Sequence, residues 1–230
     1  MKQRNTAIIL AGGAGKRMKA SKPKQLLSIA SKPIILRAIE CFENNPLITD
    51  IVVVSIKDSL RQVEDLLDQS GFKKIYKIIE GGTTRRESSF LGVKNVPENT
   101  KFVFIHDAVR PFVSDKIIKD VFSAAESAGA AVPAIDVKDT LVEQENDSIK
   151  NILKRKNLKK IQTPQCFEYN KILSAHEKAA QKENKNLTDD SGLILAAGGA
   201  VKIVEGSTRN IKITTQTDLI LAEQIAKSTS

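Results

Sequence analysis

Residues 7–18 read AIILAGGAGKRM, and this stretch decides the class of fold. An apolar run typical of a buried strand passes directly into a loop of small residues and two cations. Glycines let the backbone come close to a phosphate chain and turn consecutive N–H groups toward it, while cations neutralise its charge. The loop is not a Walker A motif, because no Gly-Lys-Ser/Thr closes it, and Met18 stands where a dinucleotide fingerprint needs its third glycine. It favours an α/β protein that binds phosphates, with a purely structural turn as the alternative.

Outward from this loop, short β-branched runs alternate with amphipathic segments, the pattern of parallel strands joined by crossover helices. The first strand is expected at residues 6–11, and further strands at 50–56, 74–80, 102–106 and 130–133. Helices are expected at 33–44, 58–70, 85–93 and 115–128. The last of these has apolar residues on one face behind Ser114, a suitable N-cap. The pattern predicts an α/β fold, a Rossmann-like three-layer sandwich with a mostly parallel sheet.

Residues 136–162 break this rhythm, because they are polar and highly charged. Alternation at 140–142 and 149–153 indicates two extended strands around a turn at 145–147. Such a hairpin buries little of its own surface, so we expect a protruding β-arm that leans on a second subunit. Beyond it we expect helices at 169–184, 189–197 and 217–226 and strands at 201–204 and 210–213. With no linker in sight, we predict a single domain over 1–230 and a dimerisation arm at about 136–162.

Composition narrows the classes of protein further. The 230 residues are 41% hydrophobic and 27% charged, as in folded soluble proteins, and the formal net charge is +9. Such a charge is compatible with a Lys-rich solvated surface, with nucleic acid or with small phosphorylated ligands. Aromatic residues make up only 4% with no Trp, so stacking platforms for nucleic acid are scarce and small polyanions are the favoured partners.

Cysteine, histidine and hydropathy point to a cytoplasmic protein. Cys41 and Cys166 cannot form a disulfide framework, and His106 and His176 cannot build an ordinary zinc site. The apolar runs are far shorter than the roughly 20 residues of a membrane span, and the first six residues do not resemble a signal peptide. We therefore expect a reducing cytoplasm and no membrane partner.

The glycine loop is followed by Ser21-Lys22-Pro23-Lys24-Gln25. Pro23 restricts the local backbone, so Lys24 is expected to be held in one direction close to the loop. Here the sequence resembles the sugar-nucleotidyltransferase superfamily, whose members begin approximately A-G-G-x-G-x-R-M followed by P-K. A solvated lysine patch is the alternative.

Polar motifs also follow the later strands, at the sheet edge where ligands of open α/β sheets bind. In order they are Gly81-Gly82-Thr83-Thr84-Arg85-Arg86-Glu87-Ser88-Ser89, His106-Asp107-Ala108-Val109-Arg110-Pro111, Asp139-Thr140, Arg155, Thr163-Pro164-Gln165, Thr188-Asp189-Asp190 and Asn210-Ile211-Lys212-Ile213-Thr214. Together they resemble the family of 2-C-methyl-D-erythritol 4-phosphate cytidylyltransferases, and the resemblance runs from about Thr6 to Ala226.

That resemblance implies a homodimeric, Mg²⁺-dependent enzyme that joins CTP to a sugar-alcohol phosphate. The implied catalytic residues are Arg17, Lys24 and Lys212. The implied CTP contacts are Ala11, Gly12, Gly13, Ala14, Gly15, Gly82, Thr83, Ser88, Asp107 and Ala108. The implied contacts to methylerythritol phosphate are Asp107, Arg110, Thr140, Arg155, Thr163, Thr188 and Lys212, with Thr140 and Arg155 reaching the partner's site from the arm. Mg²⁺ would be held mainly by the CTP phosphates, with Asp107 as a candidate ligand.

Several residues have simpler interpretations. We expect His106 to orient neighbours by hydrogen bonding, since a phosphate nucleophile needs no general base. Cys41 is interpreted as core and Cys166 as a non-nucleophilic thiol, because no His is paired with it. The pair Asp189-Asp190 is open between a metal pair and a cap of the following helix. The Lys cluster around Arg155 is interpreted as a solvated arm.

Two positions depart from the usual pattern of the family, and two alternatives stay open. Thr83 stands where Asp often follows the paired glycines, so we expect backbone contacts to the base there, and Gly12 replaces an Ala. D-ribitol-5-phosphate cytidylyltransferases share most of these motifs, so the acceptor is open. A non-catalytic nucleotide- or RNA-binding α/β domain is the alternative of another class, and its binding would weaken steeply with salt.

Overall fold

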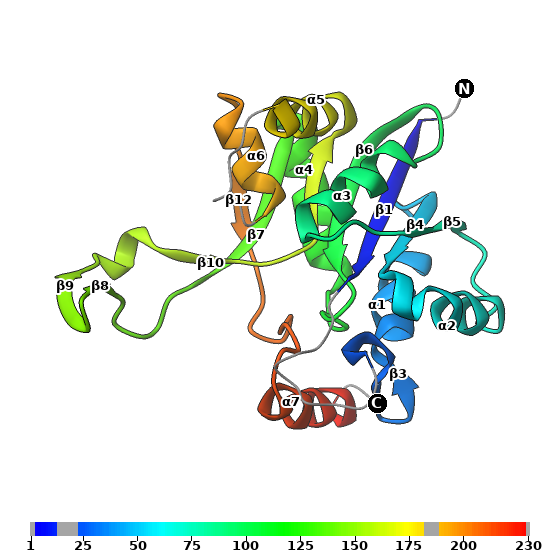
Figure 1. Ribbon diagram of the computed structural model, residues 1–230, viewed down its shortest axis with the longest axis horizontal. Helices are drawn as coiled ribbons and strands as arrows, with labels where there is room; N and C mark the ends of the chain where they lie inside the picture. Colours follow the sequence, from blue (N-terminus) through cyan, green and yellow to red (C-terminus); the bar gives the residue numbers. More distant parts are fainter. Residues whose placement is uncertain (1–2, 13–22, 182–188, 229–230) are drawn as a thin grey trace.

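A mixed sheet lies at the centre of the protein, whose computed structural model describes residues 3–12, 23–181 and 189–228 (Figure 1). Its strands follow the order β10 (Lys159–Ile161), β7 (Ala130–Asp136), β11 (Gln165–Glu168), β6 (Thr100–Asp107), β1 (Arg4–Ala11), β4 (Asp50–Ser55) and β5 (Ile75–Glu80), and β12 (Lys202–Glu205) also pairs with β7. β6, β1, β4 and β5 are parallel to one another, whereas β10 and β11 pair antiparallel with their neighbours. The predicted mostly parallel sheet is confirmed.

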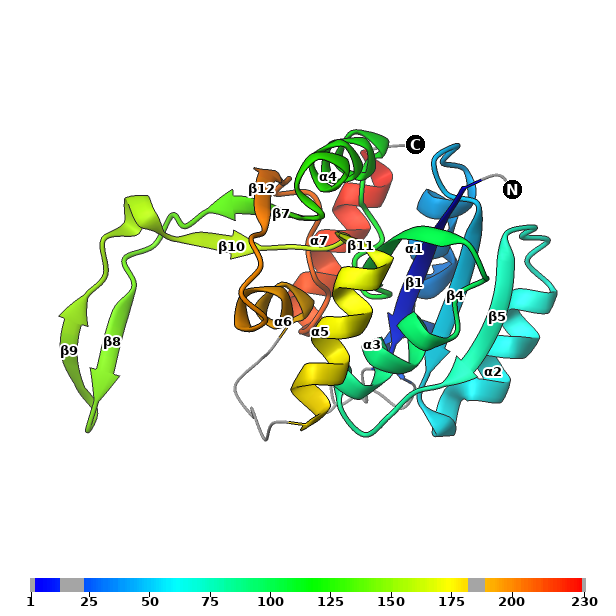
Figure 2. The same cartoon turned by 90° about the horizontal axis from the view of Figure 1, so that it is seen from above.

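Helices cover both faces of this sheet (Figure 2). Alternate residues of β1 point to opposite faces, as the period of a strand requires. Ala7 and Ile9 share a core with α1 (Ile34–Glu43), α2 (Lys57–Asp68) and α4 (Asp115–Ala128). Ile8 and Leu10 share a second core with α3 (Arg85–Lys94), α5 (Tyr169–Gln181) and α6 (Asp190–Ala196). The predicted three-layer sandwich is confirmed.

The helix α4 has the bounds that the sequence predicts. At its start, the hydroxyl of Ser114 accepts a hydrogen bond from the backbone N–H of Ile117 at 3.4 Å. At its end, Gly129 has a φ of 85°, a left-handed conformation that glycine adopts without strain. Both boundaries therefore follow from local chemistry.

The hairpin of β8 (Val142–Glu145) and β9 (Ser148–Ile152) projects away from the sheet (Figure 2). Its turn places Asn146 and Asp147 at φ values of 48° and 59°, in the left-handed region. All residues of both strands are exposed. In a single chain the hairpin therefore gains almost no stability from burial.

The prediction of a strand at 210–213 is wrong. One backbone bond, from the Ile213 N–H to the Val109 carbonyl at 2.9 Å, ties this segment to the body. The Asn210 carbonyl instead accepts from the side chains of Arg110 and Gln162, so side chains take the place of a ladder partner. The strands β10 and β11 and the short hairpin of β2 (Ser28–Ile29) and β3 (Lys32–Pro33) are additions to the prediction.

The C-terminal helix α7 (Gln216–Lys227) packs against the β2–β3 hairpin through a small third core that includes Ile29, Ile213 and Ala222. A capping box of Thr215 and Asp218 begins the helix. Among the helices of the described residues, none combines the length and apolar character needed to cross a membrane.

Candidate active site

A cavity of about 550 Å³ opens where the parallel strands β1, β4, β5 and β6 end. Because the carboxyl ends of parallel strands meet at one edge of a sheet, the segments that follow them become neighbours. Ala11 and Gly12 come from the end of β1, Gly81 and Gly82 from the end of β5, and Asp107 from the end of β6. Its size is within the usual range of small-molecule sites, roughly 300–1,000 Å³.

Lys24 reaches this cavity from a short 3₁₀ turn, Lys24–Leu26. The next residue, Gln25, is fully buried, and its Nε2 donates to the Ala11 carbonyl at 3.0 Å and to the Ser59 hydroxyl at 3.2 Å. Gln25 therefore fastens this turn to the end of β1. Lys24 therefore lines the same cavity as Ala11 and Gly12, the described start of the glycine loop.

Asp107 is the centre of an ion-pair cluster. Its Oδ2 lies 2.8 Å from Nζ of Lys212 and 3.6 Å from Nε of Arg110, and its Oδ1 lies 3.4 Å from Nε of Arg85. Burial alone would raise the pKa of this carboxyl, but the charges of Arg85, Lys212 and Arg110 outweigh burial and hold its pKa far below the usual range. Asp107 is therefore an anion throughout the neutral range and cannot supply a proton.

Lys212 owes its position to anchors on both sides. Before it, the Asn210 side chain is fully buried and its Nδ2 donates to the Thr163 carbonyl at 2.9 Å. After it, the buried Ile213 bonds to Val109, and the Thr214 N–H donates to Asp218 at 2.8 Å. The backbone at Lys212 is therefore fixed although its side chain is 38% exposed.

His106 lies behind Asp107 in a directed chain of hydrogen bonds. The Asp107 N–H donates to the Thr163 hydroxyl at 3.1 Å, and that hydroxyl lies 3.0 Å from Nδ1 of His106. The Arg110 carbonyl, 3.0 Å from Nε2, can only accept, so Nε2 carries the proton and Nδ1 accepts from Thr163. Burial lowers the pKa of His106 to about 4, so the imidazole is neutral. The predicted orienting role, rather than that of a base, agrees with this arrangement.

The predicted contacts to the base, Gly82, Thr83 and Ser88, lie at the start of α3, where the backbone is held by hydrogen bonds to Glu87. Thr84 and Glu87 form a capping box, and the Glu87 carboxylate also accepts from the Thr83 N–H at 2.7 Å and from its hydroxyl at 2.6 Å. A Cβ on Gly82 would come within 2.3 Å of the Glu87 Cβ. Glycine is therefore required at 82 for this close approach, and Thr83 is engaged by the protein itself.

The predicted site residues separate into four groups. Those that line the cavity are Ala11, Gly12, Lys24, Gly82, Thr83, Ser88, Asp107 and Lys212. Those that are buried beside it and support Asp107 or its strand are Ala108, Arg110 and Thr163. Exposed in or beside the arm, outside the cavity lining of the same chain, are Thr140 and Arg155. Outside the described residues are Gly13, Ala14, Gly15, Arg17 and Thr188.

Comparison with known proteins gives the site its context. Residues 5–228 match the family described as IspD, 2-C-methyl-D-erythritol 4-phosphate cytidylyltransferase. The chain belongs to this family. A relative of that name from Clostridium botulinum (strain Langeland) is 42% identical over 223 residues, covering 96% of this chain and 97% of the relative. A Clostridium novyi relative of the same name is 40% identical over 227 residues, 98% of this chain and 97% of its own.

Solved structures lead to the same cytidylyltransferase family. The 4-diphosphocytidyl-2C-methyl-D-erythritol synthase of Anaerococcus prevotii superposes with a TM-score of 0.86 at 30% identity, covering 98% of this chain and 96% of that one. The Francisella tularensis 2-C-methyl-D-erythritol 4-phosphate cytidylyltransferase gives a TM-score of 0.82 at 27% identity, covering 97% and 100%. The predicted fold and the prediction of an enzyme are confirmed, and the non-catalytic alternative is set aside.

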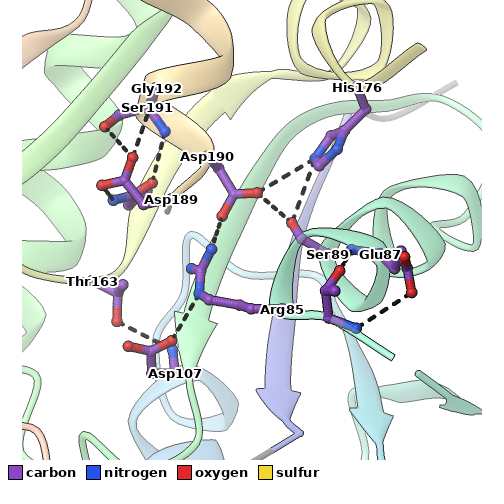
Figure 3. A network of polar contacts seen from close by, with 12 residues as sticks. Arg85, Glu87, Ser89, Asp107, Thr163, His176, Asp189, Asp190, Ser191 and Gly192 are labelled. Carbon is purple, nitrogen blue, oxygen red and sulfur yellow. Dashed lines mark hydrogen bonds and ion pairs between the residues drawn. The ribbon is translucent and has the colours of Figure 1, made fainter. Parts of the chain in front are cut away.

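The two adjacent aspartates, Asp189 and Asp190, have different roles in the structure. Asp189 caps α6 by accepting from the Gly192 N–H at 3.0 Å. Asp190 is 1% exposed and pairs with Nη1 of Arg85 at 2.8 Å (Figure 3). The cap is confirmed. Within residues 3–12, 23–181 and 189–228, no three His, Cys, Asp or Glu side chains gather as around a metal ion.

Sequence reasoning missed Arg85 and Gln25 as parts of the candidate site, although both line the cavity. The capping box predicts that a helix begins near Arg85, but no spacing shows that this side chain meets Asp107 and Asp190. For the two thiols, the interpretation agrees with the structure. Cys41 packs against the core, where burial raises its pKa to about 12, and burial likewise raises the pKa of Cys166 well above its usual value.

Proposed function

We propose that the protein transfers the cytidylyl group of CTP to 2-C-methyl-D-erythritol 4-phosphate and releases pyrophosphate. The family supports this reaction, and one observation indicates which residues perform it. Lys24, Asp107 and Lys212 are far apart in the sequence but line a single cavity. That cavity therefore offers fixed cations around a fixed anion, which suits two phosphorylated substrates.

The chemistry needs positioning more than proton transfer. A phosphate oxygen of the acceptor attacks the α-phosphorus of CTP and forms a new P–O bond. The bond from that phosphorus to the bridging oxygen breaks, and pyrophosphate leaves with the electron pair. Because the attacking phosphate is already an anion at neutral pH, no side chain has to remove a proton.

Cations of the chain would lower the repulsion between the two substrates. We assign to Arg17 and Lys24 the charge on the α-phosphate and the leaving pyrophosphate, and to Lys212 the acceptor phosphate. Lys212 is already fixed against Asp107 at 2.8 Å, so little reorganisation is needed when charge develops. Arg110 and Thr163 would keep Asp107 in place from behind.

Base recognition is assigned to the segment between β5 and α3. The Ser88 hydroxyl lies 3.4 Å from the Gly82 carbonyl, and both residues line the cavity. A backbone carbonyl facing the exocyclic amine of cytosine would disfavour uracil, which presents a carbonyl there. The Thr83 hydroxyl donates to Glu87, so we assign the selectivity for cytosine to backbone groups of this segment and not to the Thr83 side chain.

Mg²⁺ would enter with the nucleotide as Mg–CTP and shield the triphosphate charge. The donor set of the described residues does not fit a resident ion. Both oxygens of Asp107 face cations, and the other carboxylates that line the cavity, Asp58 and Glu80, do not gather with Asp107 as around a metal ion. We therefore propose that the phosphates of CTP supply most of the ligands. A direct bond from Asp107 would require Lys212 or Arg85 to move away.

We propose that two copies associate through the arm, residues 136–162. The arm exposes large apolar side chains, with Ile149 at 67%, Ile152 at 63% and Val142 at 41%. The body exposes Ile203 at 57% near the base of the arm. An arm that is exposed along its length gains its order from a second surface. Thr140 and Arg155 would then reach the site of the partner.

The partners and compartment follow from the same observations. We propose small anions, not nucleic acid, as the ligands, since the cations of the site converge in a cavity and not on an open face. We propose a reducing cytoplasm as the compartment, which the two free cysteines, Cys41 and Cys166, support.

A pyrophosphate-release assay tests the reaction. The protein is supplied with Mg²⁺ and CTP, together with methylerythritol phosphate, ribitol 5-phosphate or no acceptor, and UTP replaces CTP in a parallel series. Release with methylerythritol phosphate and CTP alone is the expected result. Preference for ribitol 5-phosphate would reassign the acceptor, and no release with either acceptor would contradict cytidylyl transfer.

A further inference from the structure

A buried polar network extends from the cavity into the layer of helices behind it (Figure 3). Arg85 is its bridge. Nη1 of Arg85 lies 2.8 Å from Oδ2 of Asp190, and Nε lies 3.4 Å from Oδ1 of Asp107. One guanidinium thus joins a carboxylate at the cavity to a carboxylate that is 1% exposed.

Asp190 is itself fixed by two further side chains. Its Oδ1 accepts from the Ser89 hydroxyl at 2.5 Å and lies 3.4 Å from Nε2 of His176. The His176 ring is in turn stacked on Phe90, with ring centroids 5.2 Å apart. Three helices, α3, α5 and α6, therefore meet at this carboxylate.

The helix geometry explains why these groups meet. Arg85 and Ser89 are four residues apart on α3, so they lie on one face, and that face is directed at the first residue of α6. Burial alone would lower the pKa of Arg85 and raise that of Asp190, but each group is held in its charged form by the other. A planar guanidinium can bridge two carboxylates, which a lysine ammonium cannot do with the same geometry.

We propose that Arg85 is a positioning residue of the transfer reaction, and that Asp190, fixed by Ser89 and His176, holds Arg85 against Asp107. Arg85 acts through Asp107: it fixes Oδ1, and Oδ2 is thereby directed at Lys212, 2.8 Å away. Asp190 acts through Arg85. This inference rests on the proposed function, because it assigns Asp107 and Lys212 to the substrates.

A double-mutant cycle tests the linkage. Arg85→Gln and Asp190→Asn each remove the bridge, and each is expected to lower kcat/KM by about 10- to 100-fold, by analogy with the loss of groups that orient metal ligands. If Asp190 acts through Arg85, the double variant is no worse than Arg85→Gln alone. Losses that multiply in the double variant would overturn the proposal, as would either single variant within twofold of the wild type.

Further variants separate positioning from folding. Ser89→Ala deletes one hydroxyl and tests the anchor if Asp190→Asn does not fold; it is expected to lower kcat by about tenfold, the scale of a hydrogen bond to a charged group. Arg85→Lys keeps the charge and is expected to fail to restore kcat, and full rescue would contradict the bridge. Arg61→Gln and Asp65→Asn make the same chemical changes at exposed positions of α2 and serve as matched controls.

The wild-type protein separates failure of this inference from failure of the proposed function. If it binds CTP but transfers to no acceptor, the proposed function is wrong. The cycle is then measured on the Kd for Mg–CTP by calorimetry, where the same non-additive pattern is expected. If transfer is normal but the cycle is additive, the inference alone is wrong.

Discussion

Acid should weaken the protein through Asp190, and the size of the effect follows from the ion pair with Arg85. Burial tends to raise the pKa of Asp190, but Arg85 and the hydrogen bonds from His176 and Ser89 lower it from 3.8 to about 2. The folded protein therefore binds this proton less readily than the unfolded chain. The resulting stability is fully present above pH 4 to 5 and is lost as pH falls through the folded pKa.

The difference between the two pKa values corresponds to a total on the order of 2 kcal/mol. Roughly 1 kcal/mol of that should be lost by pH 3, and most of the remainder by pH 2. The pKa of Asp107 is also depressed, so Asp107 likewise stabilises the fold less as the pH falls. Asp107 is present both in the wild type and in Asp190→Asn. The difference between wild type and Asp190→Asn therefore isolates the contribution of Asp190 to first order.

Urea unfolding followed by far-UV circular dichroism suits a chain with no Trp. Unfolding free energies are measured for the wild type and Asp190→Asn at several pH values from 5 to 2, at constant ionic strength. The advantage of the wild type should shrink by about 1 kcal/mol between pH 5 and pH 3. Asp65→Asn, on an exposed helical position, should give a curve parallel to the wild type. A difference between wild type and Asp190→Asn that stays constant over this range would refute an ionised, Arg-paired Asp190.

Three other predictions concern the cavity and the arm. Lys212→Ala should lower kcat by about 10²–10³ while the protein still folds, with a lower melting temperature because Asp107 loses an ion pair. Lys202→Ala should change neither quantity, and near-wild-type turnover of Lys212→Ala would contradict the role of Lys212. Ile149→Asp should shift a dimer to monomer in sedimentation velocity and abolish turnover, and an unchanged sedimentation coefficient would argue against the arm interface. Gly12→Ala should keep CTP affinity, because Ala stands at this position in the usual pattern of the family and the nearest protein atoms to a new Cβ are 3.8 Å away. Gly82→Ala should lower CTP affinity, since its Cβ would lie 2.3 Å from the Glu87 Cβ. Equal affinities in calorimetry would contradict the close approach described between Gly82 and Glu87.

The assembly of the cavity could be predicted because it depends on strand order. Residues that follow parallel strands meet at one edge whatever their distance in the chain, so the motifs at Gly82 and Asp107 were expected to be neighbours. Lys24 was placed by the restriction that Pro23 imposes on the turn. The positions of Gly82, Asp107 and Lys24 follow from local chemistry and from a common topology, and both can be predicted from a single sequence.

What the sequence did not predict depends on contacts between distant side chains. The bridge of Arg85 joins residues 107 and 190, and no periodicity relates those positions to 85. The segment 210–213 has the composition of a strand, yet the side chains of Arg110 and Gln162 donate to the Asn210 carbonyl, which a neighbouring strand would otherwise pair with. β10 and β11 were not predicted, because strands of three and four residues are too short for the alternation of apolar and polar side chains to distinguish them from loops.

The two buried carboxylates explain how so much positive charge can be held at one place. Arg85, Arg110 and Lys212 approach one another closely, and without counter-charges their repulsion would drive the side chains apart. Asp107 and Asp190 balance two of the three charges, so the cluster keeps one net positive charge before Lys24 is counted. The anions thus fix the directions of the cations, and the cations still attract a polyanion. An acceptor phosphate that reaches Lys212 competes with Asp107 for an ammonium already aligned, so binding needs an exchange of partners and not a search by a flexible side chain.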